Sequence, residues 1–164
     1  PCPTQKVHIP ISPIAHAIDA LSALLLILSW GYLLFNYAGI PEIIPTHYNF
    51  EGVADKSGDK IQLLVLVGVG SVIYIALYIL NFFPHKMNHL ATITENNAFY
   101  QYSIAKNMFR LINLAIAITF SYLSSKSVNN ALNGKTDLDA WMTPVILVVI
   151  FAPLAYYLFK LAKK

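Results

Sequence analysis

Four long runs without a single Asp, Glu, Lys or Arg constrain this chain more than any other feature. They cover residues 20–41, 61–85, 111–125 and 140–159. A bilayer core takes roughly 20 helical residues, so the first, second and fourth runs are long enough to cross a membrane. The third run is short, but its apolar pattern continues backward to Phe99. It therefore predicts the lipid-buried half of a longer helix.

The runs predict an all-α membrane protein with four transmembrane helices and a structured extracytoplasmic loop between the first two. Lipid offers no hydrogen bonds to a bare backbone, so each span is expected to be helical. A transmembrane barrel would need segments that alternate apolar and polar residues, and a run such as LSALLLIL does not alternate. We predict one integral membrane domain, residues 1–164, with helices at about 13–38, 61–83, 93–124 and 138–161.

The basic residues set the expected orientation. If the amino terminus is cytoplasmic, seven basic residues fall inside and four outside, which favours cytoplasmic termini. The inside residues are Lys6, Lys86, Lys106, Arg110, Lys160, Lys163 and Lys164, and the outside residues are Lys56, Lys60, Lys126 and Lys135. The net charge of +3 follows from this anchoring, so we expect the lipid bilayer as a partner and no nucleic acid.

Two ionisable residues lie near the start of the first predicted helix. His16 and Asp19 are one turn apart and share a face. Ionisable side chains in a span are candidates for a functional site. An acidic residue near a helix start has a structural explanation as well, and the sequence leaves both readings open. In the second helix, Gly68, Gly70 and Ser71 predict a place where a neighbouring helix approaches closely.

The third predicted helix is too long for a bilayer core. Thr92 followed by Glu95 has the spacing of a capping box, which predicts a helix start near residue 93. Because the pattern runs to about residue 124, we expect the first turns to project into the cytoplasm or the interface. The residues expected to project are Tyr100, Gln101, Lys106 and Arg110.

The polar loop at residues 44–60 reads IPTHYNFEGVADKSGDK and contains turn chemistry. Pro45 stiffens its entry, and Gly52 and Gly58 permit turns that other residues resist. Asp55, Asp59 and Lys60 are placed to form local ion pairs or to cap the second helix. An ordered lid is the structural expectation for this loop.

No motif in the chain predicts catalysis or a cofactor. Asp55, Ser57 and Asp59 alternate as in a calcium loop, but Lys60 stands where that pattern demands Gly. His47 with Glu51 and Asp55 offers zinc-type ligands, although loop spacing alone does not make them converge.

The remaining candidates are weaker. His85 and His89 have the spacing of a helical metal pair, yet Lys86 replaces the Glu of a metallopeptidase. Nucleophile-elbow, phosphate-loop and dinucleotide motifs are absent from the sequence. We predict a protein that is not an enzyme and holds no metal or cofactor.

The loop resembles the signature of a domain-of-unknown-function family of small bacterial membrane proteins, approximately IPxHxxxxGxxDxxxxK. The matching residues are Ile44, Pro45, His47, Gly52, Asp55 and Lys60. The segment FPHKMNHLATITENNAFYQYSIAKNMFR resembles the version of this family in Bacteroidetes-type bacteria. The same domain forms the amino-terminal part of SdpI-type immunity proteins, which have additional carboxy-terminal spans that this sequence does not show.

This resemblance implies a location and a role. It implies the bacterial inner membrane and, through the SdpI-type relatives, immunity to a toxic peptide together with sensing of a peptide or protein partner. The residues carried over as partner-binding are His47, Gly52, Asp55 and Lys60. Two alternatives stay open. One is an accessory subunit of a larger membrane complex, and the other is a small transporter or membrane enzyme that uses His16, Asp19 or the loop carboxylates.

Overall fold

The computed structural model describes residues 7–87, 89, 92–139 and 141–162. Its longest elements are four helices that are long and apolar enough to cross a membrane, as the sequence predicts. A two-stranded antiparallel sheet lies between the first two helices. The elements in chain order are α1 (Pro13–Asn36), η1 (Tyr37–Gly39), β1 (Ile43–Tyr48), β2 (Ala54–Asp59), α2 (Ile61–Leu80), η2 (Pro84–Lys86), α3 (Ala98–Asn133) and α4 (Met142–Ala162).

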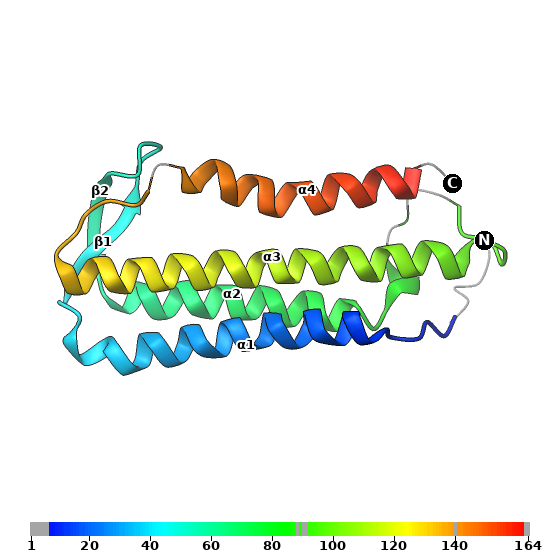
Figure 1. Cartoon of the computed structure of the whole chain (residues 1–164), viewed down its shortest axis with the longest axis horizontal. Coiled ribbons are helices and arrows are strands. Elements are labelled where there is room, and N and C mark those ends of the chain that lie inside the picture. Colours follow the sequence, from blue (N-terminus) through cyan, green and yellow to red (C-terminus); the bar gives the residue numbers. More distant parts are fainter. Residues whose placement is uncertain (1–6, 88, 90–91, 140, 163–164) are drawn as a thin grey trace.

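Consecutive long helices run in opposite directions, and α3 occupies the centre of the arrangement (Figure 1). It packs against α1, α2 and α4, while the contacts of α4 are mainly with α3. We call the end with β1 and β2 the hairpin end. The opposite end holds residues 7–12, η2 and the start of α3, and we call it the tail end.

The first helix shows how local sequence and packing agree. Ser12 caps it by accepting a hydrogen bond from Ala15 N at 3.2 Å, and Pro13 fits the first turn, where its missing N–H is not needed. One stripe of the helix is buried. The carboxy-terminal part of α1 joins an apolar core at the hairpin end. This core is formed by Leu33, Ile40, Ile44, Leu63, Val67, Val128 and Ala131. This core fixes the start of β1 against the helices.

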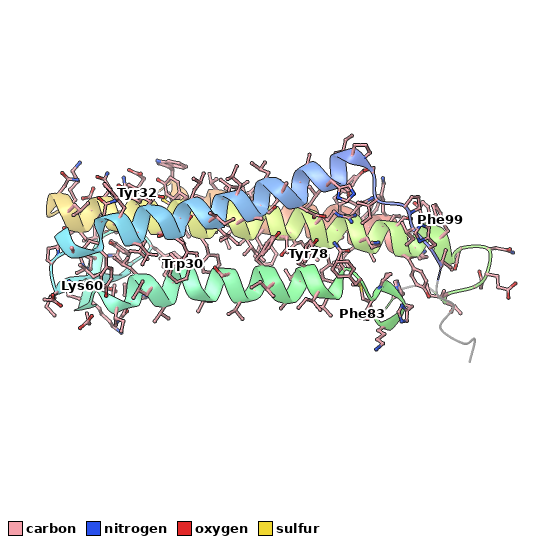
Figure 2. The ribbon with its side chains drawn as sticks, turned by 90° about the horizontal axis from the view of Figure 1, so that it is seen from below. Trp30, Tyr32, Lys60, Tyr78, Phe83 and Phe99 are labelled. Carbon is pink, nitrogen blue, oxygen red and sulfur yellow. The ribbon has the colours of Figure 1, made fainter. Side chains whose placement is uncertain are left out.

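The contact between α2 and α3 depends on Gly70. A Cβ at this position would lie 2.6 Å from Cγ of Phe120, whereas a Cβ at Gly68 would meet nothing within 4 Å. Close helix approach is therefore confirmed at Gly70 but not at Gly68. Trp30 of α1 points towards α2 in Figure 2 and donates a hydrogen bond of 3.0 Å to Ser71 Oγ.

The predicted limits of the third helix were wrong at both ends. The helix begins at Ala98 after Asn97, whose side chain bonds the preceding segment by accepting from Thr94 N and donating to Thr92 O and makes no capping hydrogen bond to the helix. At the other end it continues to Asn133 and stops at Gly134, whose φ of +64° is typical of a helix terminus. Packing explains this extension, since Val128 is fully buried in the core at the hairpin end.

The first turns of α3, expected to project into the cytoplasm or to lie at the interface, pack partly against the rest of the chain. Gln101 has no exposed surface, and Arg110 is only 6% exposed. Both side chains are buried against neighbouring elements, because α3 is the central helix and packs against α1, α2 and α4. The other limits differ by a few residues: α2 ends at Leu80 and α4 begins at Met142.

Candidate functional site

The loop at the hairpin end is a β-hairpin with a fixed turn. Asn49 makes the turn by accepting hydrogen bonds at its side-chain oxygen from Glu51 N at 3.0 Å and Val53 N at 2.9 Å. Gly52 has a φ of +81°, a conformation that glycine adopts without strain. The turn presents Phe50, whose surface is 90% exposed. The expected ordered lid is thus a hairpin with an aromatic residue at its tip.

His47 and Asp55 form a pair across the two strands. Nδ1 of His47 lies 2.5 Å from Oδ1 of Asp55, and both side chains are largely exposed. The hydrogen bond with His47 holds the pKa of Asp55 below its usual value. Two of the four predicted binding residues therefore lie together on the solvent side of the hairpin.

Lys60 lies at the base of the hairpin and anchors it to the end of α1. Its Nζ donates hydrogen bonds to Glu42 Oε1 at 2.8 Å and to the carbonyl oxygen of Ile40 at 3.3 Å, and lies 5.0 Å from the ring centre of Tyr37. The hydrogen bond with Glu42 raises the pKa of Lys60. Lys60 is labelled at the hairpin end in Figure 2. Its geometry suits a structural role at the base of the hairpin rather than direct contact with a partner.

Of the two local roles predicted for Asp59, the bond to the start of the second helix is confirmed. Its Oδ1 accepts a hydrogen bond of 2.7 Å from Ile61 N and so satisfies an amide in the first turn of α2. Asp55, Ser57 and Asp59 lie on β2. Among the described residues, no three His, Cys, Asp or Glu side chains converge as a metal ion would require.

The linker before α4 holds the hairpin from its second side. Ala54 N donates to Thr136 O at 2.9 Å, and Leu138 N donates to Gly52 O at 2.7 Å. Asn130 of α3 donates in turn to the carbonyl oxygen of Asp137 at 2.7 Å. Gly52 therefore contributes both to the turn and to this linker contact. Nothing in the sequence pattern pointed to the contact, because backbone groups make most of it.

The linker is itself fixed to α3 by Asp139. Its Oδ2 accepts hydrogen bonds from Lys126 Nζ at 2.9 Å and from the hydroxyl of Tyr122 at 3.1 Å. Lys126 and, to a smaller extent, Tyr122 hold the pKa of Asp139 below its usual value. The hairpin, the linker and the end of α3 consequently form one connected unit.

A cavity of about 360 Å³ lies beneath the hairpin, between β1, α2 and α3. Its polar lining comes from Thr46, Tyr48, Gln62 and Ser127, and its largest apolar side chain is Phe120. Burial raises the pKa of Tyr48. The cavity gives the inner side of the hairpin a space next to apolar helix surface.

A second polar cluster lies inside the bundle, towards the tail end. Arg110 Nε donates a hydrogen bond to Asp19 Oδ2 at 3.1 Å, and the hydroxyl of Tyr74 donates to the backbone oxygen of Asp19 at 3.2 Å. Asn113 donates to the backbone oxygen of Tyr74 at 3.3 Å. The cluster therefore joins α1, α2 and α3. Sequence reasoning singled out Asp19 but considered His16 as its neighbour, and it missed Arg110.

In a comparison with known protein families, one family model matches the part of the chain that contains the hairpin. Residues 24–70 match the family model described as a domain of unknown function, DUF1648. The match covers the second half of α1, the whole hairpin and the first half of α2. It supports the expected relation to a family of unknown function, and it includes all four predicted binding residues.

A similar protein is an uncharacterised protein of Archaeoglobus fulgidus. It is 24% identical over 159 residues, which cover 88% of this chain and 86% of that protein. No solved structure matches the chain significantly.

Proposed function

We propose that the chain is a non-enzymatic, multi-pass protein of the bacterial inner membrane whose hairpin recognises a peptide or protein partner outside the cytoplasm. Four apolar helices of spanning length support the membrane location. Both chain termini would be cytoplasmic, because the tail end then carries the larger share of Lys and Arg.

The main support for recognition by the hairpin is that it is held at several points and presents exposed side chains. Lys60 fixes its base, the linker at residues 134–139 fixes its second side, and Asn49 fixes its turn. A surface held in its binding conformation loses little entropy on association. Phe50 at the tip and the pair of His47 and Asp55 beside it are the groups we assign to partner contact. Aromatic residues, Phe included, are enriched in protein interfaces relative to the rest of the surface.

The test is recovery of partners from membranes after crosslinking. We expect Phe50→Ala and His47→Ala to lose a partner that the unaltered protein retains. Phe35→Ala is the matched control, since Phe35 on α1 is 89% exposed, almost as much as Phe50. Recovery of the same partners with the hairpin variants would exclude the hairpin as the recognition surface.

An immunity role is the specific form of this proposal. The resemblance of the loop to SdpI-type immunity proteins supports it, and His47, Gly52, Asp55 and Lys60 are the residues carried over. A deletion strain is expected to become sensitive to a secreted toxic peptide, and the Phe50→Ala and His47→Ala variants are expected to fail to restore resistance. Full resistance in the deletion strain to the peptides of neighbouring strains would contradict this role.

Helix α4 favours a second candidate, an accessory subunit of a larger membrane complex. Only 6% of its most apolar window is buried within the chain, compared with 44% for α3. Its packing against α3 leaves large side chains such as Val148 and Phe151 exposed. Extraction in mild detergent is expected to recover the protein in a stoichiometric complex with other membrane proteins. A monomer under these conditions would argue against the subunit role.

A further inference from the structure

The tail end contains a cavity with an unusual set of side chains. It has a volume of about 630 Å³ and is bounded by residues 7–11, the first turns of α1, the segment after α2 and the start of α3. Its polar lining consists of His8, His16, His85, Tyr102 and Lys106. Three elements distant in sequence thus bring three imidazoles and an ammonium group to one space.

The ionisable side chains in this lining are all basic or neutral. None of the described residues that line the cavity is Asp or Glu, and none of the ion pairs between described residues includes Lys106. The nearest carboxylate along α1 is Asp19, which Arg110 already engages. Imidazole donates a hydrogen bond whether neutral or protonated. The lining therefore offers hydrogen-bond donors and positive charge, which is the chemistry that binds an anion.

The start of α1 adds to the positive electrostatic potential of the cavity. His16 lies in its second turn, and the first turn contains no acidic residue. The amino-terminal end of a long helix carries a partial positive charge. The position of α1 therefore strengthens the preference of the cavity for a negatively charged group.

The rest of the lining is apolar. Phe82, Phe83 and Ile11 border the cavity and remain partly exposed, at 58%, 41% and 40%. Figure 2 shows Phe83 at the tail end. A free inorganic ion would use only the polar part of such a lining. An amphiphile would use both parts, its phosphate on the nitrogen atoms and its glycerol and first methylenes on the aromatic rings.

We propose that this cavity binds the phosphate group of an acidic phospholipid. The inference rests on the membrane location under Proposed function, which puts the tail end at the cytoplasmic leaflet. Basic pockets between helices on that side are suited to anionic headgroups. Lys106 supplies an ammonium group, and His8, His16 and His85 supply donors around the phosphate oxygens.

The experiment uses the purified full-length protein in an uncharged detergent. Short-chain phosphatidylglycerol, short-chain phosphatidylcholine and inorganic phosphate are titrated separately, and binding is measured by calorimetry. We expect phosphatidylglycerol to bind about ten-fold more tightly than phosphatidylcholine. Lys106→Gln is expected to weaken phosphatidylglycerol binding about five-fold, the effect of one basic residue near a headgroup, and Lys106→Arg is expected to retain it.

Lys86→Gln is the matched control, because Lys86 is an exposed lysine at the same end that does not line the cavity. Equal losses for Lys86→Gln and Lys106→Gln, or equal binding of the two lipids, would overturn the proposal. His85→Gln provides a second test if Lys106→Gln does not fold. Binding of inorganic phosphate that depends on Lys106 and equals that of the lipid would support the anion site and assign it to free phosphate.

This result is separable from the fate of the partner hypothesis. Lipid binding is measured without any protein partner, so loss of the hairpin function leaves it unchanged. Fractionation of cells tests the membrane location on its own.

Discussion

Arg110 Nε and Asp19 Oδ2 lie 3.1 Å apart, although 91 residues separate them in the sequence. Their side chains are 7% and 17% exposed. The contact joins the central helix α3 to α1 in the part of the bundle where Tyr74 of α2 also reaches Asp19. The ion pair joins two long helices, and the hydrogen bond from Tyr74 to the backbone oxygen of Asp19 adds a third.

Breaking this pair is expected to destabilise the protein strongly. Asp19→Asn leaves the Arg110 guanidinium buried without its counter-charge, and removing one partner of a buried pair costs about 3 kcal/mol or more. In a double-mutant cycle with Arg110→Gln, the double variant is expected to lose less than the sum of the two single losses. Reversible unfolding in detergent measures the three free energies, and strict additivity would show that the residues do not interact.

Gly70 and Gly68 form a natural pair for testing the packing of α2 on α3. Gly70→Ala is expected to lower the free energy of unfolding by about 1–3 kcal/mol, because the new methyl group would overlap the root of the Phe120 side chain. Gly68→Ala is expected to be neutral or to stabilise by up to about 1 kcal/mol through helix propensity. Equal effects of the two substitutions would contradict this packing.

The two partners at the base of the hairpin are expected to differ in importance. Lys60 makes three contacts and its side chain is 14% exposed, whereas the Glu42 side chain is 77% exposed. Lys60→Gln should therefore lower the Tm more than Glu42→Gln, which removes one exposed ion-pair partner. Thermal unfolding of both variants checks the order. A larger loss for Glu42→Gln would show that Lys60 does not anchor the hairpin.

The pair of His47 and Asp55 is expected to give the hairpin a pH-dependent stability at low pH. The pKa of Asp55 is lowered in the folded protein, so its contribution is complete above the ordinary carboxyl value of about 3.9. The contribution is lost as the pH falls through the lowered value, because protonation then favours the unfolded chain. Titration of the Asp55 carboxyl followed by NMR should show a midpoint below the ordinary value.

His47→Ala is the control for that titration. It removes the largest cause of the shift, so the midpoint of Asp55 should return towards the ordinary carboxyl value. An Asp55 midpoint that does not respond to the loss of His47 would disprove the pairing.

The four apolar helices and the turn at Gly52 were predictable, because each depends on residues close together in the sequence. Charge-free runs mark helices of spanning length, and a glycine in a polar loop marks a turn. The strands were not predicted. Residues 43–48 contain Pro45 and residues 54–59 are mostly polar, so neither segment shows the alternation of a typical strand.

The contacts that build the candidate sites were less accessible to sequence reasoning. Pairing of Asp19 with Arg110 depends on the rotation of α1 relative to α3, which no local pattern encodes. The linker holds the hairpin through a hydrogen bond from Leu138 N to Gly52 O. Because both groups belong to the backbone, the types of the two residues do not reveal the contact. The end of α3 was misplaced because a polar, Asn-rich segment is helical only through its packing around Val128.

The hydrogen bond from Leu138 N to Gly52 O has a mechanical consequence. It connects the hairpin turn to the linker that leads into α4, the helix that is least embedded in the bundle. The same linker is fixed to α3, because Asp139 accepts hydrogen bonds from Lys126 and Tyr122, so a displacement of the turn would also have to disturb α3. The hairpin is therefore held at its turn as well as at its base, where Lys60 bonds Glu42 and the Ile40 carbonyl oxygen.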